Sequence, residues 1–118
     1  MELLEKMAQA ALRRDSLLLR SLVQDWVRQG ASVPHLSRPI SADMKTLVVS
    51  AALAELLALQ HGQLPPTWTQ EIGALPEPFF LVEAAGNMKR LRILCETQSP
   101  EPMRKRRLYA PPLFLQFA

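Results

Sequence analysis

The first half of the chain carries apolar residues at the spacing of α-helices. Residues 1–13 gather leucine, methionine and alanine side chains on one helical face, and residues 16–29 repeat the i, i+3, i+4 pattern twice. The stretch RRDS, residues 13–16, is suited to end the first helix and to cap the second, and Gly30 supplies the left-handed residue that often follows a helix end. The pattern predicts two amphipathic helices with a break near residues 14–16.

A third helix is predicted over residues 42–61, with Ser41 or Asp43 as its cap and Gly62 at its end. This stretch is apolar nearly all round, which is typical of a central buried helix. Glu55 lies among its small apolar residues, where an unpartnered charge would lose its hydration. Pairing with an arginine of another helix and a catalytic role are the two interpretations. Pairing is favoured because buried carboxylates are usually partnered.

Prolines interrupt the helical pattern twice. Residues 31–41 contain two prolines and are predicted to form a connecting loop, whereas residues 63–82 contain four, which forbids a long helix. We expect the second stretch to be an extended arm across the helices, with Trp68 and other aromatic side chains filling grooves between them. Residues 79–82, FFLV, have the composition of a short strand, but no partner strand is evident.

Residues 87–98 are predicted to form a basic helix with Asn87 as its cap. Its apolar residues Met88, Leu91, Leu94 and Cys95 share one face, and its three cations point mostly away from that face. The helix should therefore pack on the rest of the chain by its apolar side.

The C-terminal stretch combines four consecutive cations, RKRR at residues 104–107, with an apolar end. Ser99 is positioned to cap a short helix that Pro100 would open, and this helix would carry the cations around its circumference. Residues 111–118 contain two prolines and then mostly apolar side chains, which a free terminus would expose unfavourably. We expect this tail to be buried on the domain or on a partner.

These elements predict a mainly α fold: a compact bundle of three to five helices with a Pro-rich extended arm and a docked C-terminal tail. At 118 residues the chain has the size of one domain. It divides into N-terminal helices (1–62), the arm (63–86), and a basic helical segment with the apolar tail (87–118).

Positive charge is concentrated in the C-terminal third. Residues 87–109 hold seven cations and two anions, a net charge of +5, whereas residues 1–60 are nearly neutral. An acidic partner should therefore meet the C-terminal half. A solvated face that keeps the apolar tail soluble is the other interpretation of these cations. The residues expected to contact a partner or nucleic acid are Lys89, Arg90, Arg92, Arg104, Lys105, Arg106, Arg107, Trp68, Phe114 and Phe117.

No catalytic, metal-binding or cofactor-binding signature stands out. Cys95 could act as a nucleophile with His35 or His61 as its base, but a small buried residue on the inner helix face is the simpler interpretation. The two histidines and the cysteine lack the spacing of a metal site, and four dispersed glycines do not form a phosphate-binding loop. We expect no catalytic residue, no cofactor and no metal.

Composition favours a cytoplasmic protein. The single cysteine forbids an internal disulfide, no signal peptide is evident, and the longest apolar run, residues 47–59, is too short for a bilayer and contains Glu55. We therefore expect no membrane partner.

The segments PPTWTQEIGALPEPFFL and SPEPMRKRRLYAPPLFL resemble those of a group of small, poorly characterised bacterial proteins, some of which are encoded beside toxin-like partners. The resemblance covers residues 63–115 in motif and the rest in helical layout. It implies an accessory or antitoxin-like binding protein and transfers no catalytic residue. The best-matching residues are Trp68, Pro76, Pro78, Pro100, Pro102 and Arg104, all of which could be structural.

The leading hypothesis is a non-enzymatic protein that binds another protein, as the antitoxin-like member of a bacterial two-gene system, through its arm and its tail. The alternative is a nucleic-acid-binding regulator that uses the cations of residues 87–109. An enzyme that uses Glu55 or Cys95 ranks third, and self-association into a homo-oligomer is left open.

Overall fold

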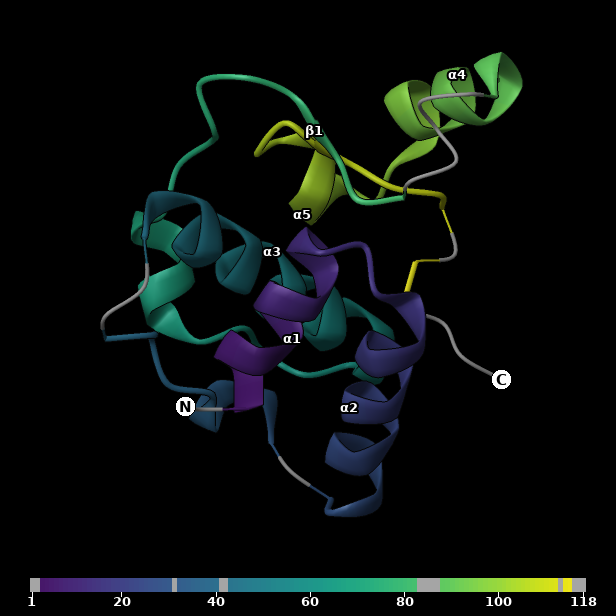
Figure 1. Ribbon diagram of the computed structural model, residues 1–118. Helices are drawn as coiled ribbons and strands as arrows, with labels where there is room; N and C mark the ends of the chain where they lie inside the picture. Colours follow the sequence, from purple (N-terminus) through teal and green to yellow (C-terminus); the bar gives the residue numbers. More distant parts are fainter. Residues whose placement is uncertain (1–2, 31, 41–42, 83–87, 113, 116–118) are drawn as a thin grey trace.

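The computed structural model describes residues 3–30, 32–40, 43–82, 88–112 and 114–115, and the statements below concern these residues. The chain forms a compact, mainly α globule with a small parallel two-stranded sheet, which confirms the predicted fold class (Figure 1). The elements in chain order are α1 (Leu3–Leu12), α2 (Ser16–Arg28), the 3-10 turn η1 (Val33–His35), α3 (Met44–His61), the 3-10 turn η2 (Thr67–Glu71), β1 (Phe79–Phe80), α4 (Lys89–Gln98), α5 (Glu101–Arg104) and β2 (Leu108–Tyr109).

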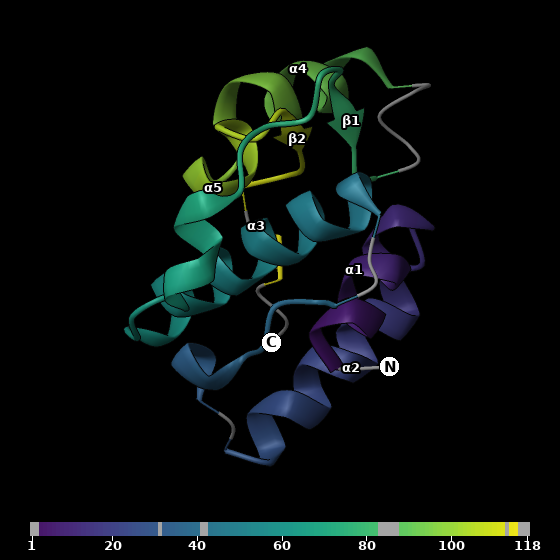
Figure 2. The same ribbon diagram turned by 90° about the vertical axis from the view of Figure 1, so that its left-hand side faces the viewer.

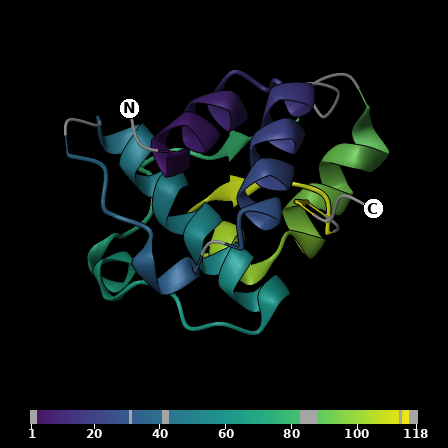
Figure 3. The ribbon, with the colours of Figure 1, turned by 90° about the horizontal axis from the view of Figure 1, so that it is seen from below.

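Helix α3 lies in the middle of the molecule. The pair α1 and α2 packs on one side of it, whereas α5 and the sheet lie on the other (Figures 2 and 3). Twelve of its residues are buried, including a continuous run from Val48 to Ala58, as the all-round apolar pattern predicted. Asp43 caps it by accepting a 2.7 Å hydrogen bond from the Thr46 amide, and Gly62 ends it with a φ of 64°.

The predicted break between the first two helices is confirmed. The Asp15 side chain accepts a 3.1 Å hydrogen bond from the Leu18 amide and so caps α2. Gly30 follows the end of α2 with a φ of 65°, as expected for a residue beyond a helix end. Arg14, between the two helices, also has a positive φ, of 57°.

The Pro-rich arm lies across the helices and supplies the strand for which no partner was evident. β1 pairs in parallel with β2, with Phe79 opposite Leu108 and Phe80 opposite Tyr109. The partner strand escaped prediction because it is two residues long and directly follows the four-cation run. The sheet therefore joins the arm to the C-terminal segment.

The described part of the C-terminal tail docks on the domain. Leu115 is buried, Phe114 packs against the core, and Gln60 donates a 2.8 Å hydrogen bond to the Phe114 carbonyl. Phe117 lies outside the described residues.

Two predicted caps near the C-terminus differ from the structure. Ser99 does not cap α5, because its hydroxyl is hydrogen-bonded to the carbonyl of Cys95 and, at 2.9 Å, to the backbone of Ala110. It thereby ties the end of α4 to the strand that follows α5. The predicted cap of α4, Asn87, lies outside the described residues. Met88 occupies the capping position there without a side-chain hydrogen bond.

The cap of α3 yields a test of stability. The hydrogen bonds from Thr46 lower the pKa of Asp43, so its charged form is favoured in the folded state. Asp43→Ala should lower the free energy of unfolding by about 1 kcal/mol in urea titrations near neutral pH. Asp25→Ala, which removes an exposed carboxylate paired with Arg28, is the matched control and should change it by less than about 0.5 kcal/mol. Equal effects of the two substitutions would contradict the capping role.

Candidate interaction surface

A buried ion pair joins the central helix to the C-terminal segment. The Arg106 guanidinium donates to both Glu55 carboxylate oxygens, at 2.7 and 2.9 Å, and Arg106 is only 2% exposed. The same guanidinium donates to the carbonyls of Thr69 at 2.9 Å and Pro102 at 3.1 Å. One side chain thus holds α3, η2 and α5 together.

Lys105 adds a second cation to the same carboxylate, with its ammonium nitrogen 2.8 Å from a Glu55 oxygen. Burial alone would raise the pKa of Glu55, but hydrogen bonds from Arg106 and Lys105 outweigh burial and lower the pKa to about 2. Glu55 is therefore ionised at neutral pH and fully engaged. This pairing confirms the favoured interpretation of Glu55, although the arginine follows α5 instead of lying within a helix.

The four consecutive cations point in different directions. Arg104, the last residue of α5, donates to the Thr97 carbonyl at 3.1 Å, and Arg107 donates to the Pro76 carbonyl at 2.7 Å. Lys105 reaches Glu55, and Arg106 is buried. Only Arg104 belongs to the helix that was predicted to carry all four. RKRR therefore does not form a continuous track for a phosphate backbone, because each cation has its own contact within the fold.

Helix α4 carries the other three predicted cations, Lys89, Arg90 and Arg92, and all three are exposed. The helix lies at the outside of the molecule, away from α1, α2 and α3 (Figure 1). Cys95 is its buried residue, whereas its apolar Ile93 is 48% exposed and Met88, just before the helix, is 55% exposed. Ile93 lies outside the predicted apolar face. Of that face, Met88 is exposed, Leu91 and Leu94 are half-buried and Cys95 is buried, so the described chain covers it only in part.

The predicted aromatic contacts serve the fold. The Trp68 indole donates a 2.9 Å hydrogen bond to the Leu36 carbonyl and packs on the core, as does the Phe114 ring. These side chains fill grooves of their own domain.

A second group of cations surrounds β1. The Arg14 guanidinium lies 4.8 Å and the Lys45 ammonium 4.6 Å from the centre of the Phe79 ring, and the Arg92 guanidinium lies 5.3 Å from the centre of the Phe80 ring. Arg14 also donates to the Phe80 carbonyl at 2.9 Å. We call these three exposed cations and two phenylalanines the β1 rim. It joins the end of α1, the beginning of α3, the arm and α4.

Sequence reasoning found Arg92 but missed Arg14 and Lys45. These two residues lie in the nearly neutral N-terminal half, and the strand they surround is far along the chain. The consecutive residues Phe79 and Phe80 indicated a strand, but nothing in the sequence indicated which cations would lie over their rings.

The candidate nucleophile lacks an activating environment. Burial and the neighbouring Glu96 raise the pKa of the Cys95 thiol, which disfavours the reactive thiolate. Among the described residues, no cluster of three or more potential ligands could hold a metal ion.

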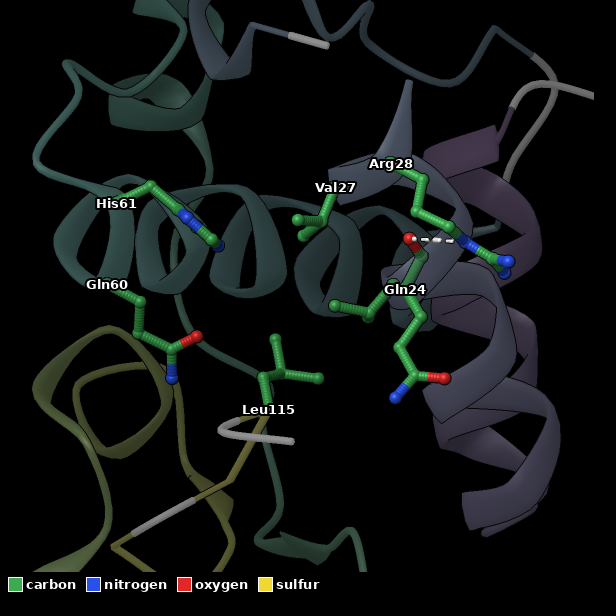
Figure 4. Close-up of a pocket in the computed structure, with 7 residues that line it drawn as sticks. Gln24, Val27, Arg28, Gln60, His61 and Leu115 are labelled. Atoms are coloured by element: carbon green, nitrogen blue, oxygen red, sulfur yellow. Dashed lines mark hydrogen bonds between the residues drawn. The ribbon is translucent and has the colours of Figure 1, made fainter. Parts of the chain in front are cut away.

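A pocket of about 730 Å³ opens between α2 and the end of α3 (Figure 4). Val23, Val27 and Leu115 give it apolar walls, and Gln60 and His61 project into it from α3. Leu115 lines this pocket, and residues 116–118, which follow it in the sequence, are outside the described part of the chain. We therefore assign no ligand to the pocket.

No family model, curated protein or solved structure matches this chain. Among the described helices, none combines the length and the apolar character that a membrane crossing requires.

Replacing the buried carboxylate tests the ion pair. Glu55→Gln should lower the free energy of unfolding by about 3–5 kcal/mol, because it leaves Arg106 charged and unpaired in the interior. The matched control is Glu71→Gln, which removes an exposed carboxylate 3.7 Å from Arg38 and should cost less than about 0.5 kcal/mol.

Acid unfolding supplies a second readout. The pKa of Glu55 is lower in the folded chain than its ordinary value of 4.5, so its stabilisation is complete above that value and is lost as the pH falls toward about 2. The Glu55→Gln variant should lose this part of the acid dependence, measured by urea unfolding at each pH. If Glu55→Gln does not fold, the uncharged double variant Glu55→Leu/Arg106→Met should recover stability. Identical pH profiles of the wild type and a folded variant would contradict the assignment.

Proposed function

We propose that this protein is a non-enzymatic accessory protein that binds another protein through α4. The exposure of α4 is the observation that carries the proposal. The helix holds cations and uncovered apolar side chains, and its described packing on the domain is slight. Arginine, methionine and aromatic residues are enriched where proteins meet.

The contact surface proposed here differs from the one expected from the sequence. The arm and the tail were expected to bind the partner, but Trp68 and Phe114 pack within the domain. Helix α4 lies between these two segments in the chain and carries three exposed cations together with the exposed apolar side chain of Ile93. We therefore assign it the primary contact.

The resemblance to small bacterial proteins encoded beside toxin-like partners supports a more specific role, the neutralising member of a two-gene system. A protein of this kind acts by covering its partner, so it needs a contact surface and no reactive group. The engaged carboxylate of Glu55 and the buried thiol of Cys95 are compatible with such a role.

Nucleic-acid binding is the second candidate, favoured by the three exposed cations of α4. Against it, Arg106 is buried and the other cations of the RKRR run have contacts within the fold. The remaining exposed cations would give weak, salt-sensitive binding.

Substitutions on α4 test the leading proposal. The chain should be co-expressed with the product of the adjacent gene, and complex formation measured by gel filtration and titration calorimetry. Met88→Ser/Ile93→Ser should weaken the complex by about tenfold or more, because both substitutions remove apolar contact area from the interface.

Leu17→Ser/Leu64→Ser is the matched control, because it removes two equally apolar side chains that are 79% and 78% exposed and lie on other elements. It should leave the affinity within about twofold. Circular dichroism must show that both double variants are folded. The proposal would be overturned by the absence of a complex, or by equal effects of the two double variants.

A further inference from the structure

The pocket between α2 and the end of α3 has an apolar lining that the described chain covers only in part. Val23 and Val27 of α2 line it together with Leu115 (Figure 4). Val23 and Leu115 are each 4% exposed, whereas Val27 is 48% exposed. The volume of the pocket, about 730 Å³, lies in the range of about 300–1,000 Å³ in which proteins hold bound groups. Filling it with an apolar group would remove the Val27 side chain from water.

The C-terminal segment is fixed at this pocket. Gln60, which also lines the pocket, donates a 2.8 Å hydrogen bond to the Phe114 carbonyl, and the Phe114 amide donates to the Pro111 carbonyl at 3.0 Å. The next residue, Leu115, is buried and belongs to the pocket lining. The chain therefore continues into residues 116–118 from a point on the pocket itself.

The backbone of Leu115 is unusual. Its φ of 66° lies in the left-handed region, which is unfavourable for a residue with a Cβ atom. Residues held in such a conformation persist only where the surrounding structure compensates. Burial of the Leu115 side chain and the hydrogen bond from Gln60 supply this compensation on the N-terminal side. A contact made by the residues that follow would hold the same conformation from the other side.

An apolar group of the chain itself is within reach of the pocket. Residues 116–118 read Gln-Phe-Ala and lie outside the described part of the chain. Phe117 is the second residue after Leu115, so the two Cα atoms are at most about 7 Å apart. A phenylalanine ring is the largest apolar group in this stretch, and its burial against Val27 and Leu115 is favoured by the hydrophobic effect.

The covalent connection favours Phe117 over a free ligand as the occupant of the pocket. A group joined to the pocket lining by two residues is present there at an effective concentration in the millimolar range. A free apolar ligand would have to compete with this concentration and would also lose its own translational freedom. The short length of chain between Leu115 and Phe117 thus selects the occupant.

We propose that the Phe117 side chain occupies the pocket between α2 and α3 and packs against Val27 and Leu115. The segment after Leu115 then acts as a strap that closes the pocket and joins the C-terminal tail to α2. Phe117, which the sequence analysis assigned to a partner, would pack within its own domain, as Phe114 does. The inference concerns the chain alone, so the absence of a complex through α4 would refute the proposed function and leave the strap standing.

Unfolding of the isolated full chain in urea tests the contact. Phe117→Ser should raise the equilibrium constant of unfolding by about tenfold or more, because the ring would lose its burial. Leu17→Ser is the matched control, because it removes an apolar side chain of α2 that is 79% exposed, and it should change the constant by about twofold or less. Equal effects of the two substitutions would overturn the inference.

A double-mutant cycle locates the contact. Val27→Ala should raise the equilibrium constant of unfolding by a factor about threefold smaller in the Phe117→Ser background than in the wild type, because side chains in contact are coupled. Leu17→Ser, on the same helix, should have the same effect in both backgrounds. Additive effects of Val27→Ala and Phe117→Ser would overturn the assignment to this pocket.

A fluorescent dye reports on the pocket independently of stability. The probe is anilinonaphthalene sulfonate, which fluoresces when it binds apolar surface. The Phe117→Ser chain, shown to be folded by near-ultraviolet circular dichroism, should bind the dye about tenfold more tightly than the wild type, because the pocket is vacated. If Phe117→Ser does not fold, Phe117→Leu, which keeps a smaller apolar side chain, should bind the dye about threefold more tightly. Equal dye binding by the wild type and the folded variant would overturn the inference.

Discussion

The ion pair between Glu55 and Arg106 is the contact on which the C-terminal half of the fold depends. It places a carboxylate of the central helix against a guanidinium from beyond α5, and the same guanidinium binds the Thr69 carbonyl of the arm. Removing one partner would leave a charge without hydration, so the segments that carry these groups must stay together. β2 begins two residues after Arg106 and pairs with β1. The position of the sheet, and so of the rim around it, depends on this pair.

The ion pair between Glu55 and Arg106 also changes how the four consecutive cations, residues 104–107, are interpreted. A run of four cations is often associated with phosphate binding. Here Arg106 is buried, and the side chains on either side of it make contacts in different directions. Arg107 adopts a left-handed conformation, with a φ of 62°, and binds the arm. The run therefore serves as a structural junction between the arm and the core. Outside this run, exposed cations of α4 and of the β1 rim come from distant segments of the chain.

The sequence was informative where a local pattern determines the structure. The apolar periodicity, together with the polar capping residues and the glycines at the helix ends, indicated the three N-terminal helices. The expected burial of Glu55 favoured a cationic partner. The sequence could not identify Arg106 as that partner, because any of the seven cations of residues 87–109 would have satisfied the same requirement. The pairing of β1 with β2 and the convergence of Arg14 and Lys45 on Phe79 depend on tertiary packing. Contacts of this kind produce no periodic pattern in the amino-acid sequence.

The position of α4 depends on a small number of contacts with the rest of the described chain. Cys95 anchors it in the interior, the Ser99 hydroxyl ties its end to Ala110, and Arg92 reaches the Phe80 ring. A cation–π contact at an exposed site contributes only about 0.5–1 kcal/mol, so the contact with the rim holds the helix weakly.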